Sequence, residues 1–226
     1  MLDGLRLAAA HAEADGARCL LLTGEGRAFS SGADLGVGGL PSDIGQALED
    51  HYNPLMEMLA ALRLPVVTAV NGAAAGAGCS LALAGDIILA GQSAYFLQAF
   101  VNVGLIPDAG ANWLLPRSVG RARAMEMMML GERIPAETAL AWGLVNRVVD
   151  DAALMDEALA MAQRLAAMPT VALGLIRRLA RDTASHSLTT ALSAERVAQR
   201  EAGETADFRA GVAAFLGKTK PVFSGK

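Results

Sequence analysis

The stretch Val66-Val-Thr-Ala-Val-Asn-Gly-Ala-Ala-Ala-Gly-Ala-Gly-Cys79 decides the fold class. Residues 65–70 are apolar and β-branched and stop at Asn71-Gly72, a pattern typical of a buried strand that ends in a turn. The small residues that follow let the backbone approach a ligand or a neighbouring segment closely. Residues 79–84 are apolar and without charge, which predicts a buried helix. The stretch therefore predicts a strand, a tight loop and a helix.

A second stretch shares this design, Leu20-Leu-Leu-Thr-Gly-Glu-Gly-Arg-Ala-Phe-Ser-Ser-Gly-Ala-Asp-Leu35. Residues 19–23 form a short apolar run that predicts a strand, and residues 32–42 are glycine-rich and loop-like. A helix that starts after such a loop leaves free N–H groups, which can bind an anion or a developing oxyanion. Spacing alone leaves two interpretations open, a structural turn or a ligand-binding loop.

The rest of the chain changes character near residue 150. Before that point strands and helices alternate, and after it the pattern is helical only. We therefore expect an α/β core over residues 1–150 and a C-terminal helical region over residues 151–226. Further strands are expected at residues 86–90, 94–96 and 145–149, and a turn at 104–110. Helices are expected at residues 2–14, 50–62, 112–120, 121–130, 136–142, 152–168, 171–184, 188–202 and 205–216.

Composition excludes several classes of protein. The chain has 226 residues and a net charge of −4, without the Lys/Arg cluster of a nucleic-acid-binding protein. The charge-free residues 64–85 contain a proline and four glycines, so they do not read as a membrane span. Cys19 and Cys79 lie in apolar runs, which indicates buried thiols in a reducing compartment. With no signal-peptide pattern at the start, we expect a cytoplasmic protein.

Common catalytic and cofactor motifs do not fit the spacing. Gly24-Glu-Gly26 is followed by Phe29 where a dinucleotide fingerprint needs its third glycine. No P-loop lysine follows a glycine run, and no G-x-S-x-G elbow occurs. The three histidines are scattered without ligand spacing: His11, His51 and His186. We expect neither a metal nor a resident cofactor.

Several motifs together resemble the crotonase family, the enoyl-CoA hydratase/isomerase superfamily. They are residues 22–35, residues 71–82 with Asp86, Gly104-Leu-Ile-Pro107, Trp142-Gly-Leu-Val145 and Pro221-Val-Phe-Ser-Gly-Lys226. The resemblance covers nearly the whole chain. It implies an α/β fold, a ClpP-like spiral of ββα units with a C-terminal all-helical trimerisation region. It also implies a homotrimer or a hexamer made of two trimers.

The resemblance implies an acyl-CoA thioester as substrate and assigns roles by position. The backbone N–H groups of Ala33 and Ala77 would form an oxyanion hole for the thioester carbonyl. Phe215 and Lys218 match positions that meet the adenine and 3′-phosphate of CoA, often across a subunit boundary; the alternative is ordinary helix surface. The other residues expected to contact the substrate are Arg27, Ala28, Ser31, Gly32, Asp34, Leu35, Gly76, Ser80 and Phe100.

The same comparison bears on the reaction. Hydration in this family uses two glutamates, and those positions hold Ser80 and Phe100, neither of which can act as a general base at neutral pH. Asp108 matches the single catalytic aspartate of the ring-1,2-epoxyphenylacetyl-CoA isomerases. One carboxylate is enough to move a proton between two carbons, so the resemblance favours an isomerase that shifts a double bond or opens a ring epoxide. Judged from the residues alone, Asp108 could instead cap the following helix.

Three other functions remain open. A hydratase could work through another carboxylate, and an aryl-CoA dehalogenase would use Asp108 as a nucleophile, although that subgroup has tryptophan where this chain has Phe100. A CoA-binding pseudoenzyme is the third. Family members usually begin with a first β-hairpin that helps to hold CoA, whereas this chain begins at Met1 in the following helix. Two interpretations stay open: the start of the chain is placed too late, or the protein lacks that hairpin.

Overall fold

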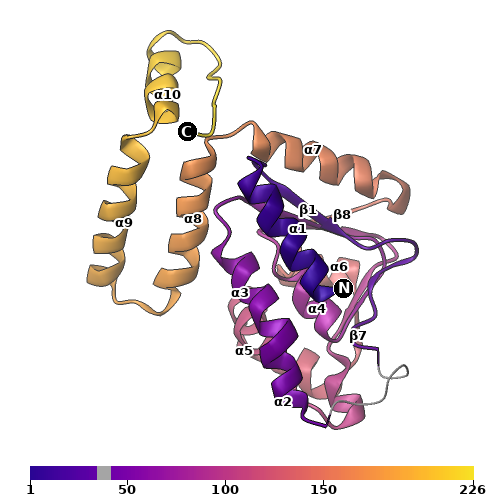
Figure 1. The fold of residues 1–226 in the computed structure, drawn as a ribbon. Helices are drawn as coiled ribbons and strands as arrows, with labels where there is room; N and C mark the ends of the chain where they lie inside the picture. Colours follow the sequence, from indigo (N-terminus) through magenta and orange to yellow (C-terminus); the bar gives the residue numbers. More distant parts are fainter. Residues whose placement is uncertain (35–41) are drawn as a thin grey trace.

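The computed structural model describes residues 1–34 and 42–226, and in these residues the strands form two sheets (Figure 1). The first sheet is wholly parallel and has the order β1 (Leu20–Thr23), β3 (Val66–Val70), β5 (Ile87–Gly91), β8 (Arg147–Val149). The second has the order β2 (Ala28–Ser30), β4 (Ala73–Ala75), β6 (Tyr95–Leu97), β7 (Arg133–Pro135). Only β7 among these is antiparallel to its neighbour.

Strands β1 to β6 alternate between the two sheets, and each pair of them is followed by a helical segment. The pair β1 and β2 leads into α2 (Ile44–Ala47), a π-helix (Leu48–Tyr52) and α3 (Asn53–Ala61). The pair β3 and β4 leads into α4 (Ala77–Ala82), and β5 and β6 into a 3₁₀ turn (Ala99–Val103) and α5 (Ala111–Leu130). The chain therefore winds as the expected spiral of ββα units. It is completed by α1 (Leu2–Ala14) and α6 (Ala136–Trp142).

The first sheet is covered on both faces. On one face α7 (Leu154–Ala166) packs Leu154, Ala158 and Met161 against Val67 and Leu89. The opposite face packs against α3, α4 and the second sheet in the larger apolar cluster. All five residues of β3 are buried, which explains why its sequence is a continuous apolar run rather than an alternating one.

Three short strands are absent from the sequence-based prediction. β2, β4 and β7 have three residues each, too few to show a periodic pattern. β4 is Ala-Ala-Ala, a composition with low strand propensity, and forms because β2 and β6 flank it on both sides. The two helices expected at 112–120 and 121–130 are confirmed, since Gly120 breaks α5 with φ 76° and ψ 163°.

The region after residue 150 is helical, as expected. α8 (Thr170–Asp182) and α9 (Leu188–Gly203) lie side by side away from the sheets, and α10 (Ala206–Leu216) continues beyond them (Figure 1). Within the described part of the chain, no single helix has the length and apolar character to cross a membrane. Residues 151–166 and 170–185 meet those criteria only as a pair, across a bend of 104°.

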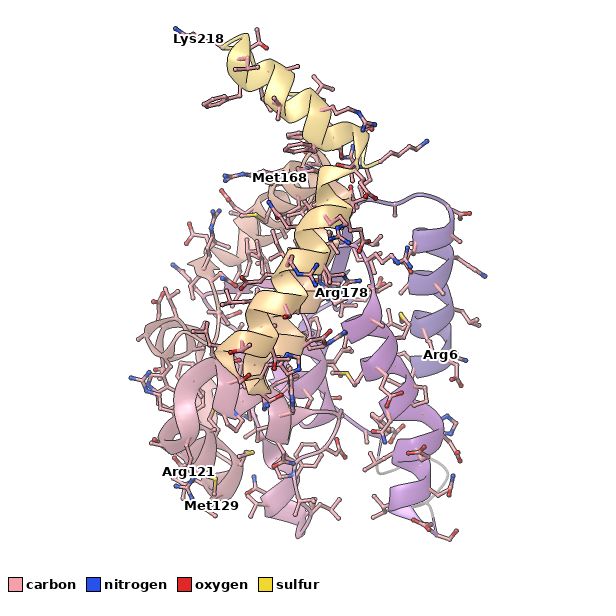
Figure 2. The ribbon with its side chains drawn as sticks, turned by 90° about the vertical axis from the view of Figure 1, so that its left-hand side faces the viewer. Arg6, Arg121, Met129, Met168, Arg178 and Lys218 are labelled. Carbon is pink, nitrogen blue, oxygen red and sulfur yellow. The ribbon has the colours of Figure 1, made fainter. Side chains whose placement is uncertain are left out.

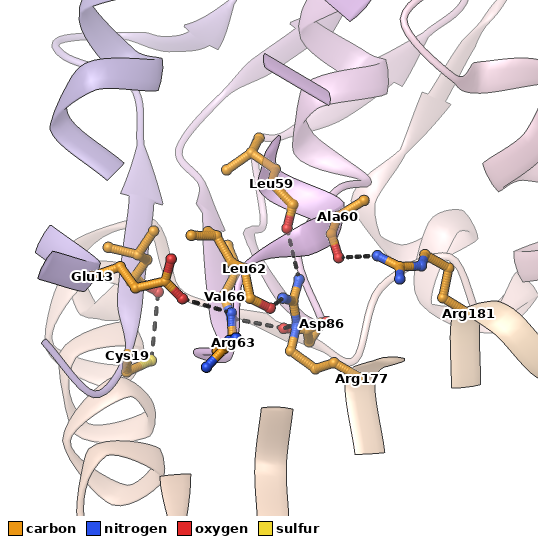
Figure 3. A network of polar contacts seen from close by, with 11 residues as sticks. Glu13, Cys19, Leu59, Ala60, Leu62, Arg63, Val66, Asp86, Arg177 and Arg181 are labelled. Atoms are coloured by element: carbon orange, nitrogen blue, oxygen red, sulfur yellow. Dashed lines mark hydrogen bonds and ion pairs between the residues drawn. The ribbon is translucent and has the colours of Figure 1, made fainter. Parts of the chain in front are cut away.

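An arginine ties this helical region to the core (Figure 3). Arg177 of α8 donates to the carbonyl groups of Leu59 and Leu62 at the end of α3. Its Nε lies 2.6 Å from Oδ2 of Asp86, which also accepts the N–H of Val66 at 2.7 Å. The last carbonyls of a helix lack intrahelical donors and carry partial negative charge. The Arg177 guanidinium supplies both the missing hydrogen-bond donors and a positive charge.

Candidate functional site

The two glycine-rich loops follow the carboxyl ends of two neighbouring strands in the second sheet. β2 and β4 are parallel neighbours, so the segment after Ser30 and the segment after Ala75 emerge side by side. Gly32 has φ +91° and Gly76 has φ +54°, both in the range that L side chains rarely adopt. A methyl group added to Gly32 would lie 2.9 Å from the oxygen of Ala75 and 3.7 Å from the nitrogen of Ala77. The two loops are therefore in backbone contact.

The second loop begins a helix at Ala77. The first N–H groups of any helix have no intrahelical acceptor. Gly76, the N-cap of α4, has no side chain that could accept from them. The Gly76 N–H itself donates to the Leu97 oxygen at 2.8 Å, which fixes the loop to β6. α4 begins two residues earlier than the sequence predicted, and this places Ala77 in its first turn.

Close packing also joins α4 to the first loop. A methyl group on Gly78 would lie 2.5 Å from Cβ of Ser30, so only glycine allows this approach. The Ser30 hydroxyl in turn accepts the N–H of Gly32 at 3.2 Å.

A cavity of about 530 Å³ opens beside these loops. Ala33 and Ala77 both line it, so the structure brings these two predicted residues to one space. The far wall comes from α1, the π-helix and α3. The remaining lining residues are Met1, Leu2, Asp3, Ser30, Gly32, Asp34, His51, Tyr52, Leu55, Met56, Gly78, Leu81 and Ala109.

Asp108 directly precedes the lining residue Ala109, and its charge acts on Tyr52, another residue of the cavity wall. Burial raises the pKa of its carboxyl from 3.8 to about 6. Among the described residues, the buried Oδ1 of Asp108 has no hydrogen-bond partner. The alternative of a helix cap does not hold, because α5 begins after Gly110, which acts as N-cap without a side-chain bond. A half-buried carboxylate with a pKa near neutrality suits a general base.

The turn that carries Asp108 is held by its main chain. The oxygen of Asp108 accepts the Ser80 hydroxyl at 2.9 Å and the Ala111 N–H at 3.0 Å. Ala109 has φ +48°, an uncommon conformation for a residue with a side chain. Backbone strain of this kind persists only where surrounding contacts fix it, and it clusters at functional sites.

Ser80 and Phe100 have different surroundings in the structure. Ser80 is fully buried and is not among the described residues that line the cavity; its hydroxyl donates to the main-chain oxygen of Asp108. Phe100 packs against Ala77 and Ala109, and a methyl group on Gly76 would meet its ring at 3.9 Å. Neither side chain supplies a carboxylate. Of Ser80, Phe100 and Asp108, only Asp108 can act as a base.

The other predicted contact residues near the loops are spread along the first of them. Arg27 is exposed just before β2, and its carbonyl packs against Gly72. Ala28 begins β2, and Ser31 is exposed beside Gly32. Asp34 lies on the cavity wall. Leu35 falls outside the described residues.

Phe215 and Lys218 do not join this group within one chain. Phe215 is 83% exposed on α10, and Lys218 follows the end of that helix with φ +52°. Lys218 lies at the outer tip of α10, far from Arg6 of α1, the helix whose first residues line the cavity (Figure 2).

Sequence reasoning missed the contribution of the wall opposite the loops. Tyr52 lines the cavity and packs with Met56 against the cluster of Ala77, Phe100 and Ala109. Burial, followed by the nearby charge of Asp108, raises the pKa of Tyr52. The available signal was weak, one of two tyrosines standing two residues before a proline in a predicted helix. In the described part of the chain, no three His, Cys, Asp or Glu side chains gather as metal ligands would.

Known proteins resemble the chain over nearly its full length. The enoyl-CoA hydratase/isomerase family model matches residues 1–226. A 1,2-epoxyphenylacetyl-CoA isomerase of Escherichia coli (strain K12) is 51% identical over 218 residues, covering 94% of this chain and 83% of the relative. A 2,3-dehydroadipyl-CoA hydratase of the same organism is 35% identical over 206 residues, covering 91% and 80%.

Solved structures agree with this assignment. An enoyl-CoA hydratase from Bacillus anthracis superposes with a TM-score of 0.93 at 32% identity, covering 100% of this chain and 88% of the other. One from Polaromonas sp. JS666 gives 0.90 at 35% identity, covering 99% and 89%. The chain has the crotonase fold and belongs to the enoyl-CoA hydratase/isomerase family.

Proposed function

We propose that this protein is an acyl-CoA isomerase that shifts a double bond or opens a ring epoxide, with Asp108 as its acid and base. The observation that carries the proposal is the Asp108 carboxyl, half-buried beside the two loops, with a pKa of about 6 and an Oδ1 without a partner among the described residues. The 51% identity to an isomerase acting on 1,2-epoxyphenylacetyl-CoA supports it.

The chemistry needs two parts. The N–H groups of Ala33 and Ala77 would hold the thioester oxygen as it gains negative charge; one such donor contributes about 3–4 kcal/mol at a transition state. The Asp108 carboxylate takes a proton from the carbon next to the thioester carbonyl, and the electron pair moves onto that oxygen. The same carboxyl then returns the proton two carbons further along the chain. The double bond moves, and no atom is gained or lost.

Hydration fits the site less well. It requires water activated by one group and a proton delivered by another, and the two family glutamate positions hold Ser80 and Phe100. Ser80 is occupied with the main chain of Asp108, and Phe100 is apolar. Apolar walls at Ala77, Phe100 and Ala109 keep water from the carboxylate and raise its basicity.

The test is the variant Asp108→Asn, assayed with a cis-3-enoyl-CoA and a trans-2-enoyl-CoA. We expect the wild type to isomerise the first, and the variant to lose that activity by about 10²–10⁴-fold, because the amide cannot accept the proton. Asp150→Asn is the matched control, since this exposed carboxylate makes no side-chain cap bond. An equally fast variant would disprove the role of Asp108. A wild type that mainly adds water would instead establish a hydratase.

We also propose that the active assembly is a trimer or a pair of trimers, in which Phe215 and Lys218 reach the CoA of a neighbouring subunit. Lys218 lies far from Arg6 of α1, the helix whose first residues line the cavity of the same chain, which is consistent with that role (Figure 2). The helical region also exposes apolar side chains that an interface would cover: Leu188, Leu192, Val197, Phe208 and Leu216.

A further inference from the structure

Tyr52 is placed where an acyl group would lie. Its side chain lines the same cavity as Ala33 and Ala77 and packs against Ala77 and Ala109. It is close enough to Asp108 for the carboxylate charge to disfavour its ionisation, so the hydroxyl keeps its proton at neutral pH. Among the described residues, the hydroxyl has no hydrogen-bond partner. Tyr52 therefore presents a free donor beside Asp108.

A local irregularity of the helix sets this position. The run from Ile44 to Ala61 is helical throughout, and Leu48–Tyr52 within it is π-helical. Pro54 lacks an N–H, and its ring would clash with the carbonyl of Asp50 in a regular α-helix. The wider π turn includes Asp50 and makes room for the proline. Such turns also redirect the side chains they carry, and they occur frequently at functional sites.

Among the described lining residues, apolar side chains stand beside the carboxylates of Asp3 and Asp34. Leu55, Met56 and Leu81 are apolar. Ser30 already accepts the Gly32 N–H, and His51 Nδ1 lies 3.8 Å from Asp3 Oδ2, with both of those side chains more than half exposed. A hydroxyl donor on the wall of a cavity favours a ligand that places an acceptor opposite it, because the donor otherwise stays unsatisfied when the ligand excludes water.

We propose that Tyr52 determines specificity by donating a hydrogen bond to an oxygen on the acyl group, such as that of a ring epoxide or hydroxyl. The preferred substrates are then acyl-CoA thioesters with an oxygenated acyl group rather than plain hydrocarbon chains. This inference rests on the proposed isomerase site, since it assumes that the acyl group occupies the cavity beside Asp108.

A binding measurement tests this inference without relying on the proposed reaction. Calorimetry measures the affinity of three proteins: the wild type, Tyr52→Phe and Tyr95→Phe. The ligands are phenylacetyl-CoA and its ortho-, meta- and para-hydroxy forms. Tyr95 is the other tyrosine of the chain and stacks on Arg133, a contact that phenylalanine keeps. We expect one hydroxy form to bind the wild type and Tyr95→Phe about 10-fold more tightly than phenylacetyl-CoA. Tyr52→Phe should lose that preference while binding phenylacetyl-CoA as before.

Turnover gives a second readout. The ratio of kcat/KM for a ring-epoxide acyl-CoA to kcat/KM for a cis-3-enoyl-CoA, which has no acyl oxygen besides the carbonyl, should fall about 10-fold in Tyr52→Phe and stay unchanged in Tyr95→Phe. A wild type without a preference for any hydroxy form, or a Tyr52→Phe variant that keeps the preference, would overturn the inference. Unchanged isomerisation in Asp108→Asn would instead overturn the proposed function and leave the binding result intact.

Discussion

At the residue scale, the raised pKa of Asp108 should make the rate of isomerisation depend on pH. Its pKa is raised to about 6 by burial, so the carboxyl gives up its proton about two pH units later than an ordinary aspartate. The base form is the ionised one. We expect kcat/KM for isomerisation to rise with pH as this proton is lost and to level off above about pH 6–7.

The measurement is a pH profile of kcat/KM between about pH 4.5 and 8 with a substrate that is stable over this range. The thermal unfolding temperature, followed over the same range, controls for loss of the folded enzyme. A profile that is flat from about pH 5 upward would contradict the prediction, because it would mean that the catalytic base has an ordinary carboxylate pKa.

Much of the candidate site at this scale could be predicted from sequence. Motif positions predict Ala33, Ala77 and Asp108; in the structure Ala33 and Ala77 line one cavity, and Asp108 precedes the lining residue Ala109. Tyr52 could not be found in that way, because its place depends on a π turn and on the packing of α3 across the cavity. The sequence predicts that Ser80 contacts the substrate, whereas in the structure its hydroxyl donates to the main-chain oxygen of Asp108, a bond that no sequence pattern indicates.

At the element scale, the join between α8 and α3 gives a stability prediction. The Arg177 side chain is 9% exposed and bonds both the Asp86 carboxylate and the end of α3. Replacing it with methionine leaves that carboxylate and two carbonyls without their donor. We expect Arg177→Met to lower the free energy of unfolding by about 2–3 kcal/mol, because the ion pair is partly buried and two helix-end carbonyls also lose their donor.

Arg178→Met is the matched control for this experiment. Arg178 is the next residue along α8, and its pair with Glu201 at 3.3 Å is about half exposed on both sides. Exposed pairs contribute about 0–1 kcal/mol, so this variant should unfold nearly like the wild type. Urea titrations of both variants make the comparison. Equal losses would mean that Arg177 has no special part in holding the helical region to the core.

The elements themselves were predictable to different degrees. β3 and the C-terminal helices have clear apolar patterns, and both are where the sequence put them. The three-residue strands were not predictable, since a run such as Ala73–Ala75 becomes a strand only between two neighbours. The helix expected at residues 50–62 is preceded by a further helical segment that begins at Ile44, which the sequence did not predict.

At the scale of the whole molecule, Lys218 tests the proposed assembly. If it reaches the 3′-phosphate of CoA on a neighbouring subunit, Lys218→Ala should raise KM for acyl-CoA substrates by about 10-fold and leave kcat unchanged. Lys220→Ala, two residues further along the tail, is the control. Light scattering on the same samples should give three or six times the 23.3 kDa of one chain.

A monomer with full activity would contradict this arrangement, as would equal effects of the two lysine variants. The ββα spiral and the helical C-terminal region followed from the sequence because several motifs appear in the family order. How subunits meet could not be read in that way, since exposed residues such as Phe215 and Leu216 show an apolar surface without indicating its partner.

The interlocked loops restrict how such a protein can diversify. Gly32 rests on Ala75 and Ala77, and Gly78 rests on Ser30, with no room for even a methyl group at two of these contacts. Neither loop can be reshaped without displacing the other, so mutation has little freedom on that side of the cavity. New substrate ranges would have to arise on the opposite side, from α1 and the helix that carries Tyr52, and a library for directed evolution belongs there.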